Sequence, residues 1–119
     1  MMRNLLLVGL GGMIGSMVRY LVMIAFRDFS FPYGTLVVNV IGSLIMGVVA
    51  ALFVKHSISS EVRLFLATGI CGGFTTFSAF SLENVQLITE NRYGAALGYV
   101  VVSFTLGIAA VFAGWMLAK

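Results

Sequence analysis

The side chains of this sequence that could do chemistry are few, and most of them are hydrogen-bond donors set inside long apolar runs. Thr35, Asn39 and Ser43 recur at intervals of four residues, and Tyr99 and Ser103 repeat this spacing nearer the C-terminus. Residues four apart lie on one face of a helix. Hydrogen bonding between helices explains either stripe alone, whereas the two stripes together with a broken third helix begin to indicate a polar pathway.

Two charged residues also lie within apolar runs. Arg19 follows Gly11 and Gly15 at four-residue spacing in the first run, and Glu83 lies in the third run. The glycines predict a packing seam between helices. A charge in hydrocarbon is costly unless it is paired, hydrated or near the surface, so both charged residues are functional candidates. The alternative for Arg19 is a side chain that extends to the headgroups.

The segment 71–80, CGGFTTFSAF, interrupts the third apolar run with small and hydroxyl residues. Such residues favour either a break, whose freed backbone groups the hydroxyls satisfy, or close packing of intact helices. Thr76, Phe80 and Glu83 share one helix face, with Phe77 one turn before Phe80. Hydroxyl donors and phenylalanine ring edges suit an anion, although core packing alone would also explain the rings.

The composition is that of a membrane protein. Of 119 residues, 61% are hydrophobic and only 9% are charged, and the mean hydropathy is +1.09. A soluble domain of this size needs a more polar surface than these residues supply. The net charge of +3 comes from loops and chain ends, which indicates membrane orientation rather than nucleic-acid binding.

Four apolar stretches, about 4–26, 33–54, 61–90 and 93–117, are each long enough to cross a bilayer. They lack the polar alternation of barrel strands, and backbone groups in lipid must be satisfied internally, so all four are predicted to be helices. The connections are short, and the sequence predicts a single transmembrane domain over 1–119. Lys and Arg are only slightly more frequent on the side of the two termini, which leaves room for insertion in both orientations.

Other kinds of site are not indicated. Cys71 is the only cysteine and His56 the only histidine, so one chain can form neither an internal disulfide nor a site built from these ligands. No nucleophile, base and orienting group occur at catalytic spacing, and we therefore do not expect an enzyme.

The sequence resembles the CrcB/Fluc family of fluoride channels over essentially its whole length. The resemblance rests on GGMIGSMVRY in the first run, TLVVNVIGSLIMG in the second and GICGGFTTFSAF in the third. The three motifs occur in this order in a chain of the usual size. Together they are specific, whereas a short part of the third alone would be weak evidence.

This resemblance implies an all-α membrane protein of four transmembrane helices, with the third helix broken near residues 72–76. It further implies an antiparallel, dual-topology homodimer, in which two oppositely inserted copies form two parallel fluoride pores. A structural sodium ion is expected at the dimer interface, held by backbone carbonyls of Gly72 and Thr75 from both copies. Carbonyl oxygens are suitable ligands for such a hard cation.

The expected site residues follow from the stripes and the resemblance together. The fluoride pore is expected to include Asn39, Thr76, Phe77, Phe80, Glu83, Tyr99 and Ser103, with Arg19 and Thr35 as structural or gating candidates. The sequence departs from the family pattern at Ala79, where threonine is usual. It departs again at Gly107, where the polar track of the fourth helix often continues with a hydroxyl residue.

The function that the resemblance implies is passive, selective export of fluoride across the cytoplasmic (inner) membrane, which would confer fluoride resistance. The main alternative is a small multidrug-type, proton-coupled antiporter, which also has four short helices in a dimer. That family carries its acidic residue in the first helix, where this sequence has only Arg19. A third alternative is an assembly protein that uses its glycine seams to bind partner helices.

Overall fold

The structure, a computed structural model, describes all residues from Met1 to Lys119, and it is helical with no strand. The elements are α1 (Met2–Ala25), α2 (Tyr33–Val54), α3 (Ser60–Arg63), η1 (Leu64–Cys71), α4 (Gly72–Phe74), α5 (Phe77–Thr89) and α6 (Tyr93–Ala118). The elements α3, η1, α4 and α5 form one span, so four spans are long and apolar enough to cross a membrane. The longest extent of 48 Å is similar to a bilayer with its headgroups, about 40–45 Å. The predicted all-α membrane architecture is therefore confirmed.

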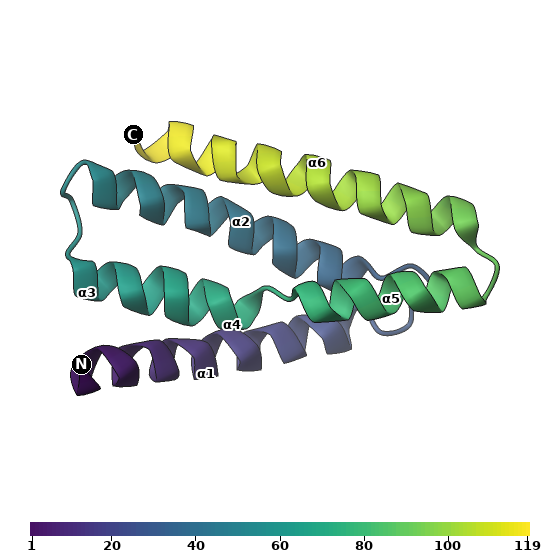
Figure 1. Cartoon of the computed structure of the whole chain (residues 1–119), viewed down its shortest axis with the longest axis horizontal. Helices are drawn as coiled ribbons and strands as arrows, with labels where there is room; N and C mark the ends of the chain where they lie inside the picture. The colour runs from purple at the N-terminus through teal and green to yellow at the C-terminus, as the bar shows by residue number, and fades with distance from the viewer.

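The four spans run alternately in opposite directions, so both termini lie at the same end of the bundle (Figure 1). Helix α2 packs along α6, and α1 packs along η1 and α4. Helix α5 follows the break and packs against the first half of α6, at the end of the bundle away from the termini. The break therefore lies at mid-length of the bundle, next to α1 and α2.

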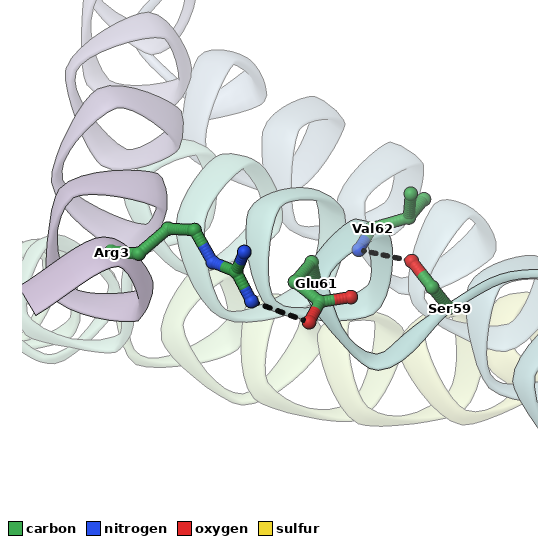
Figure 2. Close-up of polar contacts among 4 residues, drawn as sticks. All are labelled: Arg3, Ser59, Glu61 and Val62. Atoms are coloured by element: carbon green, nitrogen blue, oxygen red, sulfur yellow. Dashed lines mark hydrogen bonds and ion pairs between the residues drawn. The ribbon is translucent and has the colours of Figure 1, made fainter. Parts of the chain in front are cut away.

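Polar contacts join two spans at the end that holds the termini (Figure 2). The guanidinium of Arg3 lies 3.0 Å from the carboxylate of Glu61, which connects the start of α1 to α3. The hydroxyl of Ser59 accepts from the amide of Val62 at 3.2 Å and caps α3. The two charged side chains are 77% and 42% exposed, so this ion pair contributes only about 0–1 kcal/mol.

Glycines let neighbouring spans approach to backbone contact. A Cβ atom at Gly11 would lie 2.6 Å from the carbonyl oxygen of Phe65, and one at Gly15 would lie 2.8 Å from the amide nitrogen of Phe74. These distances are below van der Waals contact, so only glycine fits at either position. The packing seam predicted on the first helix is therefore present, and its partner is the first half of the third span.

The third span is broken between Phe74 and Phe77, as predicted. Thr75 and Thr76 are extended, with φ, ψ of −86°, 156° and −150°, 115°. The preceding helix η1 is π-helical over eight residues, Leu64–Cys71. Gly72 and Gly73 remain helical, so the unwound residues are the two threonines rather than the two glycines.

Both interpretations of the glycine- and threonine-rich segment hold at once. The threonines unwind, while a Cβ atom at Gly73 would lie 2.9 Å from the Cα of Gly12 on α1. Close packing on α1 thus fixes the helical side of the break directly before the chain leaves the helix.

Candidate functional site

A cavity of about 290 Å³ lies beside the break, between α2, the break itself and α6. Its lining consists of Asn39, Gly42, Ser43, Met46, Thr75, Thr76, Phe77, Phe80, Ser103, Phe104, Gly107 and Val111. Five of the expected pore residues are among them, namely Asn39, Thr76, Phe77, Phe80 and Ser103. Phe77 is 72% exposed and Phe104 is 55% exposed, so the cavity opens on the surface of the chain.

The side chain of Asn39 holds the break by pairing with the main chain of Thr76. Its Oδ1 accepts from the Thr76 amide at 2.8 Å, and its Nδ2 donates to the Thr76 carbonyl at 3.1 Å. A carboxamide offers one donor and one acceptor side by side, so it can pair with one residue as a neighbouring strand would. Asn39 therefore satisfies two of the backbone groups that unwinding releases, and one amide hydrogen stays free.

Three further hydrogen bonds satisfy backbone groups at the two helix ends that border the break. Arg19 Nε donates to the carbonyl of Gly73 at 3.0 Å, and Thr75 Oγ1 donates to the carbonyl of Cys71 at 2.9 Å. On the other side, Thr76 Oγ1 accepts from the amide of Ala79 at 3.1 Å and caps α5. Arg19 thus binds the negative, C-terminal end of the first half-helix.

Glu83 joins three spans through its carboxylate. Oε2 accepts from the hydroxyl of Thr35 on α2, and Oε1 accepts from the hydroxyl of Tyr99 on α6, both at 2.8 Å. Thr35 and Tyr99 are both 0% exposed. Each carboxylate oxygen therefore has its own hydroxyl donor, which meets the requirement that an acid within a membrane be hydrogen-bonded.

Phe80 connects this cluster to the cavity. Its ring centroid lies 4.9 Å from that of Tyr99, 5.8 Å from that of Phe77 and 6.1 Å from that of Phe104. Phe80 itself is buried with only 8% of its surface exposed. The two phenylalanines expected in the pore thus have different environments, one buried and one open.

A second, more polar cavity of about 440 Å³ lies beyond Glu83. Its lining residues are Ser30, Pro32, Glu83, Gln86, Leu87, Thr89 and Glu90. They belong to the α1–α2 connection, to α5 and to its C-cap residue Glu90, at the end of the bundle away from the termini. A series of polar groups therefore runs from this end through Glu83 and past Phe80 to the break.

The structure adds residues that were not among the expected pore residues. Ser43 and Phe104 line the cavity at the break. The four-residue spacing after Asn39 pointed to Ser43, whereas no sequence signal separates Phe104 from the apolar residues around it. Ser103 was expected, and its Oγ is buried without a hydrogen-bond partner.

Comparison with known proteins bears on this arrangement. Residues 6–115 match the family described as "CrcB-like protein, Camphor Resistance (CrcB)". This chain belongs to the CrcB-like family. The fluoride-specific ion channel FluC of Rhizobium meliloti (strain 1021) is 46% identical over 123 residues, covering 99% of this chain and 98% of that protein.

Other CrcB-like relatives agree with this match. The fluoride-specific ion channel FluC of Gloeothece citriformis (strain PCC 7424) is 46% identical and covers 99% of this chain and 98% of that protein. The protein of the same name from Phocaeicola vulgatus is 44% identical, with 97% and 98% covered. These names describe ion channels and not enzymes. The antiporter alternative receives no support, and this CrcB-like chain is a multi-pass membrane protein.

Proposed function

We propose that the chain forms a passive, fluoride-selective channel that carries fluoride out of the cytoplasm. The observation that carries the proposal is the cavity at the break, which is lined by hydroxyl and amide donors and three phenylalanines. Ser103 Oγ is buried there without a protein partner. The names of relatives 44–46% identical over nearly the whole chain support fluoride as the transported ion.

The chemistry of the cavity suits a small anion. Fluoride holds its water tightly, so a narrow pore must replace that water with fixed donors. Asn39 has a free amide hydrogen, Ser103 has a free hydroxyl, and the ring edges of Phe77 and Phe80 carry the positive part of the aromatic quadrupole. Helix α5 begins at Phe77, so the positive end of its dipole adds to this potential.

In this proposal the route continues past Phe80 to the cluster of Glu83, Thr35 and Tyr99. The Tyr99 ring, in contact with Phe80, joins the two parts of the route. The polar cavity beyond Glu83 would then be the opening at that end of the bundle. Thr35 acts by holding Glu83, and Arg19 acts by holding the break, so both are structural rather than pore-lining residues.

We further propose that the working unit is an antiparallel, dual-topology homodimer. The cavity is open on one side of the single chain, where Phe77 and Phe104 are exposed. A second copy would close that side and separate the pore from lipid. The weak difference in Lys and Arg between the two ends of the spans supports insertion in both orientations.

The break also fits the structural sodium ion that we propose at the dimer interface. In an unbroken helix the carbonyl of Gly72 would accept from the amide of Thr76, but this amide donates to Asn39 instead. Thr75 is extended, and no hydrogen bond of the chain reaches its carbonyl oxygen. The chain has no cluster of His, Cys, Asp or Glu that could hold a metal, so the ligands would be these carbonyls. When bound, the ion would supply positive charge where two negative helix ends meet.

The direction of transport follows from electrostatics. A microbial inner membrane, where we place the protein, is negative inside, and a passive pathway lets an anion leave along that potential. Fluoride that accumulates in the cytoplasm through weak-acid uptake would therefore move outward as the anion. The cellular result would be fluoride resistance.

Efflux from proteoliposomes tests the channel. Vesicles loaded with fluoride or with chloride are reconstituted with the protein, an electrical driving force is set by a potassium ionophore, and a selective electrode records release. We expect fluoride release and little chloride release, both unaffected when a protonophore collapses the proton gradient. Loss of fluoride efflux when the proton gradient is collapsed would contradict a passive channel. Ser57→Ala, in the exposed α2–α3 connection, is the control for reconstitution.

The dimer and the ion have separate tests. A tag after Lys119 should be accessible to a membrane-impermeant label from both sides of the membrane, and labelling from one side alone would exclude dual topology. Replacing sodium by a large organic cation should lower the thermal stability of the purified dimer. An unchanged stability would remove Gly72 and Thr75 as ligands.

A further inference from the structure

The polar groups of α6 stop before the cavity ends. Tyr99 and Ser103 lie on one helix face, and the next position on this face, four residues later, is Gly107. Gly107 lines the cavity but offers no side chain. The part of the cavity next to Gly107 therefore has no donor from α6.

A hydroxyl from α2 lies at this level. A Cβ atom built on Gly107 would have one neighbour within 4 Å, the Oγ of Ser43, at 3.8 Å. Ser43 lies one turn after Asn39 on α2 and lines the same cavity as Gly107 and Ser103. The donors of the cavity thus continue from Ser103 on α6 across to Ser43 on α2.

The hydroxyl of Ser43 is free to bind a ligand. A serine within a helix commonly donates to a carbonyl one turn earlier, as Ser16 does to Gly12 at 2.8 Å. Ser43 makes no such bond, and no other residue of the chain is its hydrogen-bond partner. A hydroxyl that faces a membrane cavity without a partner is costly unless water or a ligand pairs with it.

We infer that Ser43 is a pore residue, which donates a hydrogen bond to a small halide at the level of Gly107. It supplies from α2 the hydroxyl that α6 lacks at Gly107, and with the unpartnered Oγ of Ser103 it forms a two-donor station for the dehydrated ion. This inference rests on the proposed channel function and extends it to a residue outside the expected site.

Exchange of the hydroxyl between helices tests the inference. Ser43→Ala should lower fluoride efflux about tenfold or more, the effect of losing one hydrogen bond to a charged group. Gly107→Ser in the Ser43→Ala background should recover most of the flux, since it returns a hydroxyl to the same space from the opposite helix. Ser16→Ala, whose hydroxyl is bonded to its own helix, is the matched control and should conduct as the unchanged protein does.

Each outcome decides one statement. If the unchanged protein releases no fluoride, the proposed function fails. If it does and folded Ser43→Ala dimers conduct normally, the role of Ser43 fails alone. If Ser43→Ala loses flux and Gly107→Ser does not recover it, the inference that residues 43 and 107 serve the same position of the ion is wrong. Should Ser43→Ala assemble poorly, Ser43→Cys, a nearly isosteric and much weaker donor, is measured with the same expectation.

Discussion

Replacement of Asn39 by alanine should destabilise the protein as well as reduce transport. The substitution removes both hydrogen bonds to Thr76, at 2.8 and 3.1 Å, and leaves an amide and a carbonyl of the break without partners. Each buried, unpaired backbone group costs about 1–3 kcal/mol, so the total is about 2–6 kcal/mol. At about 4 °C or more per kcal/mol, the melting temperature should fall by at least about 8 °C.

The assay compares two variants that both remove a polar group from the cavity. Thermal unfolding is followed by fluorescence of the single tryptophan, Trp115, and fluoride efflux is measured on the same preparation. Ser103→Ala is the matched control, because the Ser103 hydroxyl has no protein partner and its removal leaves nothing unpaired. Ser103→Ala should therefore lose flux with an unchanged melting temperature, whereas Asn39→Ala should lose both.

One result would refute this reasoning. If Asn39→Ala melts like the unchanged protein while its fluoride efflux falls, the pairing with Thr76 does not stabilise the break, and Asn39 acts only as a donor to the ion. Asn39→Asp separates the two roles further. It keeps the acceptor for the Thr76 amide but sets a carboxylate oxygen against the Thr76 carbonyl and a negative charge in the cavity, so efflux should be lost almost completely.

Three other outcomes follow from the packing. Phe80→Ile should cost more stability than Phe77→Ile, because Phe80 is 8% exposed and Phe77 is 72% exposed, while both should lose fluoride flux; normal flux in folded dimers would remove that residue from the pore. Glu83→Ala should lower the melting temperature, because it leaves the buried Tyr99 hydroxyl unpaired and the Thr35 hydroxyl with only the weak Met23 sulfur acceptor, and Glu83→Gln should keep most of it; equal melting of the two variants would contradict the hydrogen-bonded cluster. Gly15→Ala should destabilise by about 1–3 kcal/mol, whereas Gly9→Ala, with nothing within 4 Å of its new Cβ, should not, and similar stabilities would argue against the seam on α1.

The sequence predicted the spans because their signal is local. Apolar length and the scarcity of charge determine each membrane helix without reference to its neighbours, and the structure has four helical spans long and apolar enough to cross a membrane. The break was also marked locally, by hydroxyl residues that can satisfy their own chain. What the sequence did not give is which residues unwind. Gly72 and Gly73 stay helical, and Gly73 packs on Gly12 of α1, a contact that depends on another span.

The partners of the polar residues could not be predicted from spacing alone. Asn39 and Thr76 are 37 positions apart, and Arg19 and Gly73 are 54 positions apart. Periodicity assigns each residue to a helix face but does not say what that face meets. Periodicity assigned Asn39 to a polar face of its helix, and the family resemblance implied that it lines the pore. Its role in holding the break appears only once α2 and the break are side by side.

The glycine seam and the arginine of α1 act together on the break. Arg19 lies one turn after Gly15, and its guanidinium reaches the Gly73 carbonyl only because the seam brings α1 to backbone distance from the third span. A larger residue at Gly15 would move α1 away and take Arg19 out of hydrogen-bonding range. The Gly73 carbonyl, at the negative end of a half-helix, would then lose its charged partner within the membrane. Changes in the α1 seam should therefore affect transport through the break, even though α1 contributes no residue to the cavity.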